Sequence, residues 1–324
     1  MQPLPQPTIL CLGEMLWDCL ADQVDVPESA VESWKAFPGG APANVACALT
    51  HLGSVCTFIG CIGDDAPGET LFQLLKENQV GTEGVQRSLF PTRHVHVIRS
   101  SKGEREFASF GGFPADRCAD AFLRADDLNP ALFKNASYLV IGSSMLAFEF
   151  SAEAVEMALD FADHYFVKVF LDVNWRPIFW TSTEGALDIV LGLIERVDFL
   201  KVSEEEAVWL GLPTVEAIHE RFDHLEGIFI TKGEAGCDWQ VGHQTGTHAG
   251  FTVPVVDTTG AGDTFVAALL HQFSQHTLAT WESQAPQFVA YASAVAALST
   301  LSPGAIGNAP TPNQVNDFLK SRSP

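Results

Sequence analysis

The segment with the clearest chemical potential is residues 257–265, which read DTTGAGDTF and precede an apolar run at residues 266–273. Glycines at positions 260 and 262 allow the backbone to approach a ligand closely. A helix that begins near Asp263 would present unpaired amides and the positive end of its dipole, which together bind anions. A carboxylate in that first turn stays ionised and can accept a proton from a hydroxyl group. The plain alternative is an N-cap aspartate after a glycine turn.

Three further segments place polar residues after predicted strands. Residues 172–177 read DVNWRP and lie where ligands bind in open α/β sheets, beyond the carboxyl ends of the strands. Arg176 could neutralise a phosphate there, and a surface ion pair is the alternative. Ser203 and Glu206 have the spacing of a capping box. Residues 231–236, TKGEAG, form a glycine turn that fits an ordinary hairpin equally well.

Two N-terminal segments complete a pattern with residues 257–265. Residues 38–46 read PGGAPANVA and residues 60–68 read GCIGDDAPG. Together the three segments resemble the motifs of the ribokinase-like (PfkB) carbohydrate kinases, and the resemblance runs over nearly the full chain. It implies an α/β fold, a ribokinase-like three-layer sandwich with a mostly parallel central sheet and a small β-strand lid, in a single domain over residues 1–324. The chain has no GxxxxGK[ST] loop and is therefore not a P-loop kinase.

The resemblance assigns a role to each matching residue on the sugar side. Asp263 is the catalytic base, and the amides of Gly260, Ala261 and Gly262 hold the transferred phosphoryl group, which suits a reaction that depends on positioning and charge stabilisation. The sugar is expected at Asp18, Gly39, Gly40, Asn44, Arg105 and Arg176. A carboxylate and an amide can each contact two hydroxyl groups, and glycine admits the sugar ring. Taken alone, Asp18 could be a turn residue, Asn44 a helix-start residue and Arg105 a solvated strand charge.

The same resemblance implies a nucleotide site with two kinds of cation. ATP is expected at Asn174, Lys201, Thr231, Gly233, Gly236, Gly260 and Gly262, with the adenine near residues 287–298. Glu206 is expected to act on Mg²⁺ through its bound water, with Ser203 in place of the family's asparagine. Asp257 and Thr259 are expected to hold a monovalent cation such as K⁺. The predicted ligands are thus ATP with Mg²⁺ and a small sugar.

The elements that must position these residues follow from the hydrophobic pattern. Short apolar runs alternate with longer helical patterns, which predicts an α/β protein with a largely parallel sheet. Strands are predicted at residues 9–12, 55–59, 138–141, 167–172, 199–202 and 227–231, and a helix at 41–52, with Pro42 in its first turn. Residues 15–37 and 92–110 interrupt the alternation and predict a small antiparallel flap, the lid, with a hairpin at 101–103. Edge strands of the main sheet are the alternative.

The composition is that of a globular protein and limits its partners. The 324 residues are 47% hydrophobic and 18% charged, and 40 acidic against 18 basic residues give a net charge of −22. This charge argues against nucleic acid or an anionic membrane as a partner. Seven cysteines without a CxxC pair, and no basic start followed by an apolar run, predict a cytoplasmic protein. His219 and His224 lie five residues apart and do not share a helix face, as zinc ligands of a protease would.

Within the family, two segments resemble fructokinases most: Gly13-Glu14 and residues 103–107, GEREF. The predicted reaction is transfer of the γ-phosphoryl group of ATP to the 6-hydroxyl of fructose. A kinase of another sugar, a sugar acid or a nucleoside is one alternative, and a non-catalytic sugar- or nucleotide-binding regulator is another. The intact Gly-Ala-Gly-Asp at 260–263 argues against the regulator. A homodimer through the lid is a further expectation.

Overall fold

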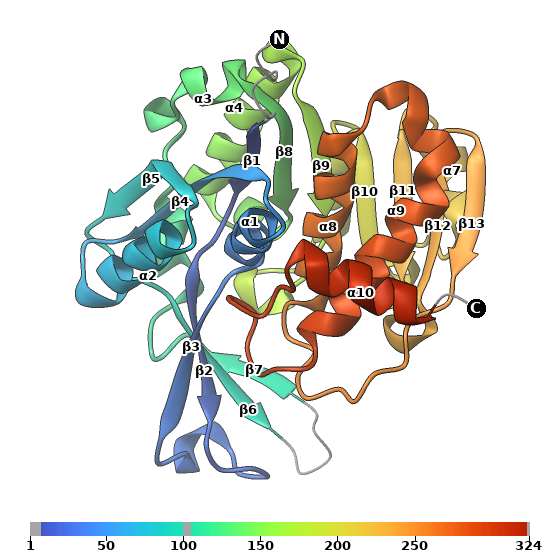
Figure 1. Cartoon of the computed structure of the whole chain (residues 1–324). Coiled ribbons are helices and arrows are strands. Elements are labelled where there is room, and N and C mark those ends of the chain that lie inside the picture. Colours follow the sequence, from blue (N-terminus) through green and yellow to red (C-terminus); the bar gives the residue numbers. More distant parts are fainter. Residues whose placement is uncertain (1–7, 100–104, 323–324) are drawn as a thin grey trace.

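A large sheet forms the centre of the molecule (Figure 1). The computed structural model describes residues 8–99 and 105–322, and in this part of the chain nine strands pair in the order β13-β12-β11-β10-β9-β8-β1-β4-β5. Their bounds are β1 Thr8–Leu12, β4 Val55–Gly63, β5 Gly81–Ser88, β8 Ala136–Gly142, β9 Lys168–Asp172, β10 Phe199–Ser203, β11 Gly227–Thr231, β12 Cys237–Val241 and β13 Gln244–His248.

The pairing within this sheet is parallel from β5 to β11, and the hairpin β12–β13 runs antiparallel at one edge. Each predicted strand is present within a few residues of its expected bounds. Strands β5, β12 and β13 were not predicted. The sequence of β5, GTEGVQRS, contains no apolar run, because an edge strand buries little of its surface. The mostly parallel central sheet expected from the sequence is confirmed.

Helices cover both faces of the large sheet, and α1, α8, α9 and α10 lie in front of it in Figure 1. Helix α1 begins with Pro42 in its first turn, as predicted. The bounds are α1 Ala41–His51, α2 Ala66–Glu77, α3 Pro130–Lys134, α4 Glu149–Tyr165, α5 Ala186–Ile194, α6 Glu204–Trp209, α7 Val215–Arg221, α8 Ala261–Gln275, α9 Leu278–Ser299 and α10 Pro312–Arg322.

The alternation of side chains along the buried strands separates two hydrophobic cores. In β1, Ile9 and Cys11 pack in the core that contains α1, α8 and α9, whereas Leu10 and Leu12 pack in the core that contains α4 and α5. Successive side chains of a strand point to opposite faces, so one strand contributes to both cores. A sheet buried on both faces needs apolar residues at every position, which explains the continuous runs in the sequence. The result is the three-layer sandwich that the sequence predicts.

A second, smaller sheet projects from the edge of the first, at the bottom of Figure 1. It consists of β2 Leu16–Ala21, β3 Trp34–Gly39, β6 His94–Arg99 and β7 Arg105–Ser109, in the order β3-β2-β6-β7. The pairs β2–β3 and β6–β7 are antiparallel as expected, but the central pair β2–β6 is parallel. The expected flap is therefore a mixed sheet of two antiparallel pairs. The predicted turn at 101–103 lies outside the described residues.

The motif at residues 60–68 ties the small sheet to the large one. Asp65 caps α2 by accepting a hydrogen bond from the Gly68 amide at 2.8 Å. The same carboxylate accepts the Thr92 amide at 2.9 Å and the Thr92 hydroxyl at 2.6 Å, just before β6. Partial burial alone would raise the pKa of Asp65, but these hydrogen bonds outweigh it and lower that pKa. The motif therefore has a structural function at the root of the small sheet.

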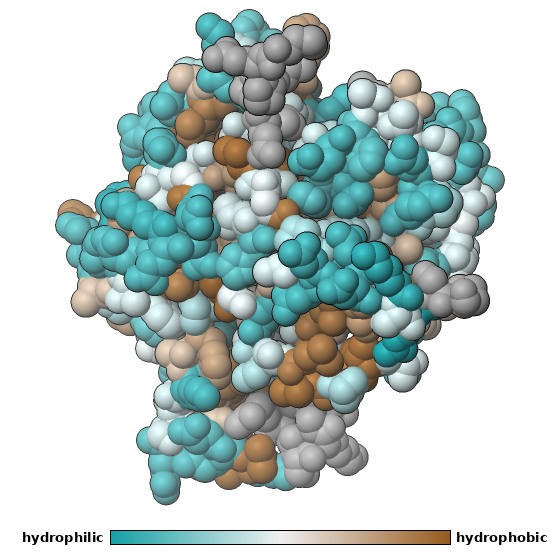
Figure 2. All heavy atoms as spheres, viewed as in Figure 1, coloured by the Kyte–Doolittle hydropathy of each residue, from teal (hydrophilic) through white to brown (hydrophobic). Residues whose placement is uncertain are grey.

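The surface agrees with the composition. Hydrophilic side chains cover most of the face shown in Figure 2, and apolar side chains gather between α10 and the small sheet. Among the described residues, no helix is both long and apolar enough to cross a membrane.

Candidate active site

A cavity of about 340 Å³ lies between the two sheets and within the range of roughly 300–1,000 Å³ typical of small-molecule sites. Its walls come from the small sheet, from the carboxyl ends of β9 and β10, and from the N-terminus of α8. Parallel strands place their carboxyl ends at one edge, which is where a ligand is expected in such a sheet. The predicted site residues that line it are Asp18, Gly40, Asn44, Asn174, Arg176, Lys201, Asp257, Thr259, Gly260, Gly262 and Asp263.

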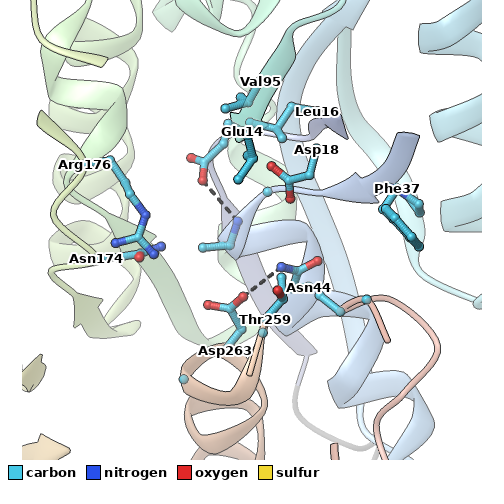
Figure 3. A pocket seen from close by; sticks show the side chains of 18 of the residues that line it. Glu14, Leu16, Asp18, Phe37, Asn44, Val95, Asn174, Arg176, Thr259 and Asp263 are labelled. Atoms are coloured by element: carbon cyan, nitrogen blue, oxygen red, sulfur yellow. Dashed lines mark hydrogen bonds between the residues drawn. The ribbon is translucent and has the colours of Figure 1, made fainter. Parts of the chain in front are cut away.

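Asp263 lies in the first turn of α8 and is held by Asn44 from α1 (Figure 3). The Asn44 Nδ2 donates to Asp263 Oδ2 at 2.7 Å, although the two residues are 219 positions apart. Gly260 has φ +78° at the N-cap, and a Cβ there would lie 2.6 Å from the Cβ of Ala305, so another residue would be strained and crowded. The glycine turn thus places the helix amides and the Asp263 carboxylate in the same cavity.

The charge state of Asp263 is set by opposing effects. Burial raises the pKa of its carboxyl group, whereas the hydrogen bond from Asn44 and the charges of Lys201 and Arg176 lower it. Burial dominates, and the net pKa lies above the ordinary value for aspartate. A raised pKa makes the ionised carboxylate a stronger proton acceptor, which suits a general base.

An ion pair buried beside the glycine turn links β9 and β10. Lys201 Nζ donates to Asp172 Oδ1 at 2.9 Å, and the register places the two residues directly opposite each other. Burial alone would lower the pKa of Lys201, but the charges of Asp172, Glu206 and Asp263 outweigh it, so the ammonium stays protonated. A Cβ added at Gly262 would lie 3.2 Å from Lys201 Nζ. The ammonium therefore stands beside the amides expected to bind the phosphoryl group.

Glu14 lines the site, although the sequence pattern assigned it no role there. It is buried at the cavity wall, where its Oε1 accepts the Ala41 amide at 3.1 Å and its Oε2 accepts the Ser144 hydroxyl at 2.7 Å. Burial raises its pKa. Gly40 has φ +104°, and a Cβ there would overlap the Glu14 carbonyl oxygen. Glu14 thus holds the first turn of α1 at the cavity. The sequence signal was an acid two residues after the end of the first strand.

The small sheet contributes the remaining sugar-side residues. Asp18 and Leu16 from β2 and Val95 from β6 lie on the same side of the cavity in Figure 3. Gly39 does not line the cavity, but a Cβ there would overlap Asp18 Oδ2, so a larger residue would displace this carboxylate from its position. The backbone of Arg105 pairs with Arg99, and its side chain lies outside the described part of the structure.

The predicted nucleotide residues separate into two groups. Asn174, which has φ +42°, extends into the cavity from the loop after β9, beside the predicted sugar-side residue Arg176. Lys201, Gly260 and Gly262 line the same cavity. Thr231, Gly233 and Gly236 belong to the hairpin between β11 and β12 and do not line the cavity. The hairpin was the alternative for this segment, and a role in ATP binding for these three residues stays a prediction.

The predicted monovalent-cation residues form a compact turn at the cavity wall. Asp257 Oδ1 accepts the Thr259 amide at 2.9 Å and its hydroxyl at 2.7 Å, and Oδ2 accepts the Gly304 amide at 3.0 Å. These contacts fix the start of the glycine turn. Binding of a monovalent cation by Asp257 and Thr259 stays a prediction.

Glu206 completes the capping box of α6 with Ser203 and also holds the loop that carries Asn174. Its Oε2 accepts the Ser203 amide at 2.7 Å, and its Oε1 accepts the Trp175 amide at 2.6 Å. Glu206 does not line the cavity. A role in ordering metal-bound water therefore stays a prediction beside this structural one.

Glu206→Gln is expected to lower stability by about 1–3 kcal/mol, because the new amide group would face a backbone donor instead of accepting from it. Chemical denaturation measures the change, and Glu205→Gln is the matched control, since this exposed neighbour lies in the same helical turn. If Glu206 also orders the water around the metal, the Mg²⁺ concentration for half-maximal rate rises in the variant. Unchanged stability would contradict the two-amide contact.

A carboxylate at a helix N-terminus, beside a lysine and a glycine turn in a closed α/β sandwich, is the arrangement of a small-molecule phosphotransferase. The comparison with known families is consistent with it: residues 6–312 match the pfkB family of carbohydrate kinases. The chain belongs to this family and is an ATP-dependent sugar kinase by class. The ribokinase-like fold expected from the sequence is confirmed.

Named relatives and solved structures agree with this assignment. A probable fructokinase-5 of Arabidopsis thaliana is 35% identical over 326 residues, covering 98% of both chains. Fructokinase-2 of Oryza sativa subsp. japonica is 34% identical over 314 residues, covering 94% of this chain and 91% of that one. A fructokinase from Xylella fastidiosa with bound ATP superposes with a TM-score of 0.88 at 26% identity, over 98% of this chain and 100% of that one. A Vibrio cholerae fructokinase with bound fructose, ADP and calcium gives 0.82 at 25% identity, over 97% and 99%.

Proposed function

We propose that this protein is a fructokinase that transfers the γ-phosphoryl group of ATP to the 6-hydroxyl of fructose. The observation that carries the proposal is the pair formed by Asn44 and Asp263. Asn44 donates to the base, while its own buried Oδ1 has no partner among the described residues and is free to accept a sugar hydroxyl. Relatives named fructokinase, at about one-third identity over almost the full chain, favour fructose as the sugar.

The side chains suit the steps of such a transfer. Asp263 accepts the proton of the attacking hydroxyl, and Asn44 fixes the orientation of its carboxylate. The amides of the Gly260 turn and the Lys201 ammonium stabilise the negative charge that spreads over the phosphoryl oxygens. Arg176 adds a second positive charge at the same wall. Asp18, Leu16 and Val95 would orient the sugar from the opposite side.

A divalent cation with the nucleotide is consistent with the charges at the site. The carboxylates of Glu14, Asp18, Asp257 and Asp263 line the cavity, where Lys201 and Arg176 are the positive groups, so the negative groups outnumber the positive ones. A cation that arrives with ATP needs few protein ligands. We propose Mg²⁺ as this cation, which would neutralise charge on the phosphates, and K⁺ as the ion at Asp257. The small sheet as a lid, a homodimer through it and a cytoplasmic location remain proposals.

Incubation of the protein with Mg-ATP and a panel of sugars, sugar acids and nucleosides is expected to give the fastest turnover with fructose. The product is expected to be fructose 6-phosphate, as the resemblance to the fructokinases implies, with the acceptor hydroxyl directed at Asp263. Phosphorus and carbon NMR of the product identify the position. Fructose 1-phosphate, or a higher kcat/KM for another acceptor, would overturn the assignment of the sugar and leave the kinase class intact.

A further inference from the structure

Arg93 is a fully buried charged residue that the proposed reaction does not use. The residue is 1% exposed and lies just before β6, where the small sheet meets the rest of the molecule. Taking a guanidinium out of water is costly unless it is paired and hydrogen-bonded, and an apolar residue of similar volume often stabilises a core equally well. Arg93 therefore needs an explanation other than stability.

The guanidinium has one ionic partner and three aromatic ones. Its Nε donates to Asp120 Oδ2 at 2.7 Å, and its Nη2 donates to the Ala115 carbonyl at 2.8 Å. It lies over the rings of Phe110, Phe148 and Phe179, at 4.6, 5.0 and 4.8 Å from their centroids. Nη1 has no hydrogen-bond acceptor among the described residues, so ring faces take the place of an acceptor there. We call Arg93, Asp120 and these three phenylalanines the Arg93 cage.

The cage joins segments that are far apart in the sequence. Phe110 directly follows β7, Asp120 belongs to the short helix η3 Ala119–Phe122, and Phe148 directly precedes α4. Phe179 ends the short helix η6 Pro177–Phe179, which follows the loop of Asn174 and Arg176. One side chain therefore contacts the strands of the small sheet and the body of the molecule at the same time.

Two walls of the cavity depend on this contact. The Arg93 carbonyl accepts the Trp17 amide at 3.0 Å, which aligns the start of β6 with β2, the strand that carries Asp18. Val95, two residues further on, lines the cavity, and so does Phe179 from the cage itself. The Arg93 cage thus sets the separation between the sugar-side wall and the wall that continues toward Arg176.

We infer that Arg93 is a positioning residue for the sugar: it holds the root of the small sheet and the Phe179 wall at the spacing that the acceptor requires. This inference rests on the proposed function, because it assumes that the acceptor binds between β2, β6 and Asp263. The predicted nucleotide residues lie after β9, in β10, at the start of α8 and in the β11–β12 hairpin, whereas the hydrogen bonds and ring contacts of Arg93 go to Ala115, Asp120, Phe110, Phe148 and Phe179. Loss of the cage should therefore affect the sugar and leave ATP binding largely unchanged.

The test uses Arg93→Met, which removes the charge at similar length, and Arg93→Lys, which keeps the charge for Asp120 without the flat guanidinium. Lysine cannot donate to Asp120 and Ala115 while it covers three rings. We expect both variants to raise KM for fructose by roughly 10- to 100-fold, as small misplacements do, with KM for ATP changed by less than about twofold.

The matched control is Arg196→Met. It removes a surface arginine that pairs with Glu156, Asp160 and Asp163, and it is expected to change neither KM.

Hydrogen exchange gives a readout that needs no substrate. The backbone amides of residues 94–97 and 178–180 are expected to exchange faster in both Arg93 variants than in the wild type and in Arg196→Met, with each protein measured the same number of degrees below its own melting temperature. A wild type that does not phosphorylate fructose defeats the proposed function, and the KM comparison is then made with the acceptor that the panel identifies. Should Arg93→Met not fold, Arg93→Lys alone decides. A folded variant with an unchanged KM for the acceptor and unchanged exchange would overturn the role of Arg93.

Discussion

Asp263→Asn is expected to lower kcat by about 10²–10⁴ while the fold stays intact, since this is the usual contribution of a positioned base. Asparagine keeps the shape of the side chain and an oxygen that can accept the hydrogen bond from Asn44, but it cannot take up the proton of the acceptor hydroxyl. Steady-state kinetics with the preferred sugar measures the effect. Asp223→Asn, at an exposed position, is the matched control. A near-normal kcat in the variant would return Asp263 to the plain role of a helix-capping residue.

The same variant has a stability signature with a defined sign. Burial raises the pKa of Asp263 in the folded state above its unfolded value, so the unfolded state releases this proton first as pH rises. Ionised Asp263 therefore destabilises the wild type at neutral pH, and Asp263→Asn is expected to melt at the same or a higher temperature there. The advantage should vanish at a pH below about 4, the ordinary range for aspartate, where the carboxyl is protonated in both states. Thermal melts of both proteins across this range test the direction.

The fold could be predicted from the sequence to the extent that local pattern determines it. The core strands β1, β8 and β11 contain continuous apolar runs because the sheet is buried on both faces, and such runs are visible without any partner. The glycine turn before α8 is equally local, and it placed Asp263 in the first turn of a helix. Family motifs then brought Asn44 to the same site, which spacing alone could not have done.

The missed features depend on register and on side-chain contacts between distant segments. Asp172 and Lys201 face each other because β9 and β10 pair in one particular register, and a shift by one residue would separate them. Strand β2 pairs with β6 in parallel, and the sequences of the two antiparallel pairs β2–β3 and β6–β7 do not by themselves indicate this pairing. Glu14 follows a strand like many surface acids, and only the positions of Ala41 and Ser144 make it a buried anchor. Each of these contacts is a property of the assembled fold.

The buried pair of Lys201 and Asp172 allows stability and catalysis to be separated. Lys201 balances Asp172, a residue that is 4% exposed, and its ammonium also lies beside Gly262 in the glycine turn, where phosphoryl charge is expected to develop. Removal of the lysine should therefore have two independent consequences. One is a buried Asp172 charge without a counter-ion, and the other is weaker stabilisation of the transition state.

Lys201→Met is expected to lower stability by about 3–5 kcal/mol, because Asp172 is then buried without a counter-ion and its pKa, already raised by burial, rises further. It is also expected to lower kcat by about 10²–10³, the range for removal of one electrostatic stabiliser of a transition state. Lys168→Met is the matched control: it lies at the opposite end of β9 and pairs with the partly exposed Asp198 and Glu226. These pairs are partly exposed, so the control should lose less stability than Lys201→Met, which breaks a buried pair.

The double variant Asp172→Leu/Lys201→Met separates the effect of Lys201 on stability from its effect on the rate. Replacing both charges by apolar groups of similar volume leaves no unpaired ion, so the melting temperature should recover most of the loss. The rate should not recover, since the ammonium beside the glycine turn is still missing. Urea denaturation and steady-state kinetics of the two single variants and the double variant form a complete cycle. Recovery of kcat together with stability would mean that Lys201 acts only as the counter-ion of Asp172, and the positive charge at the phosphoryl site would then have to come from Arg176 and the metal alone.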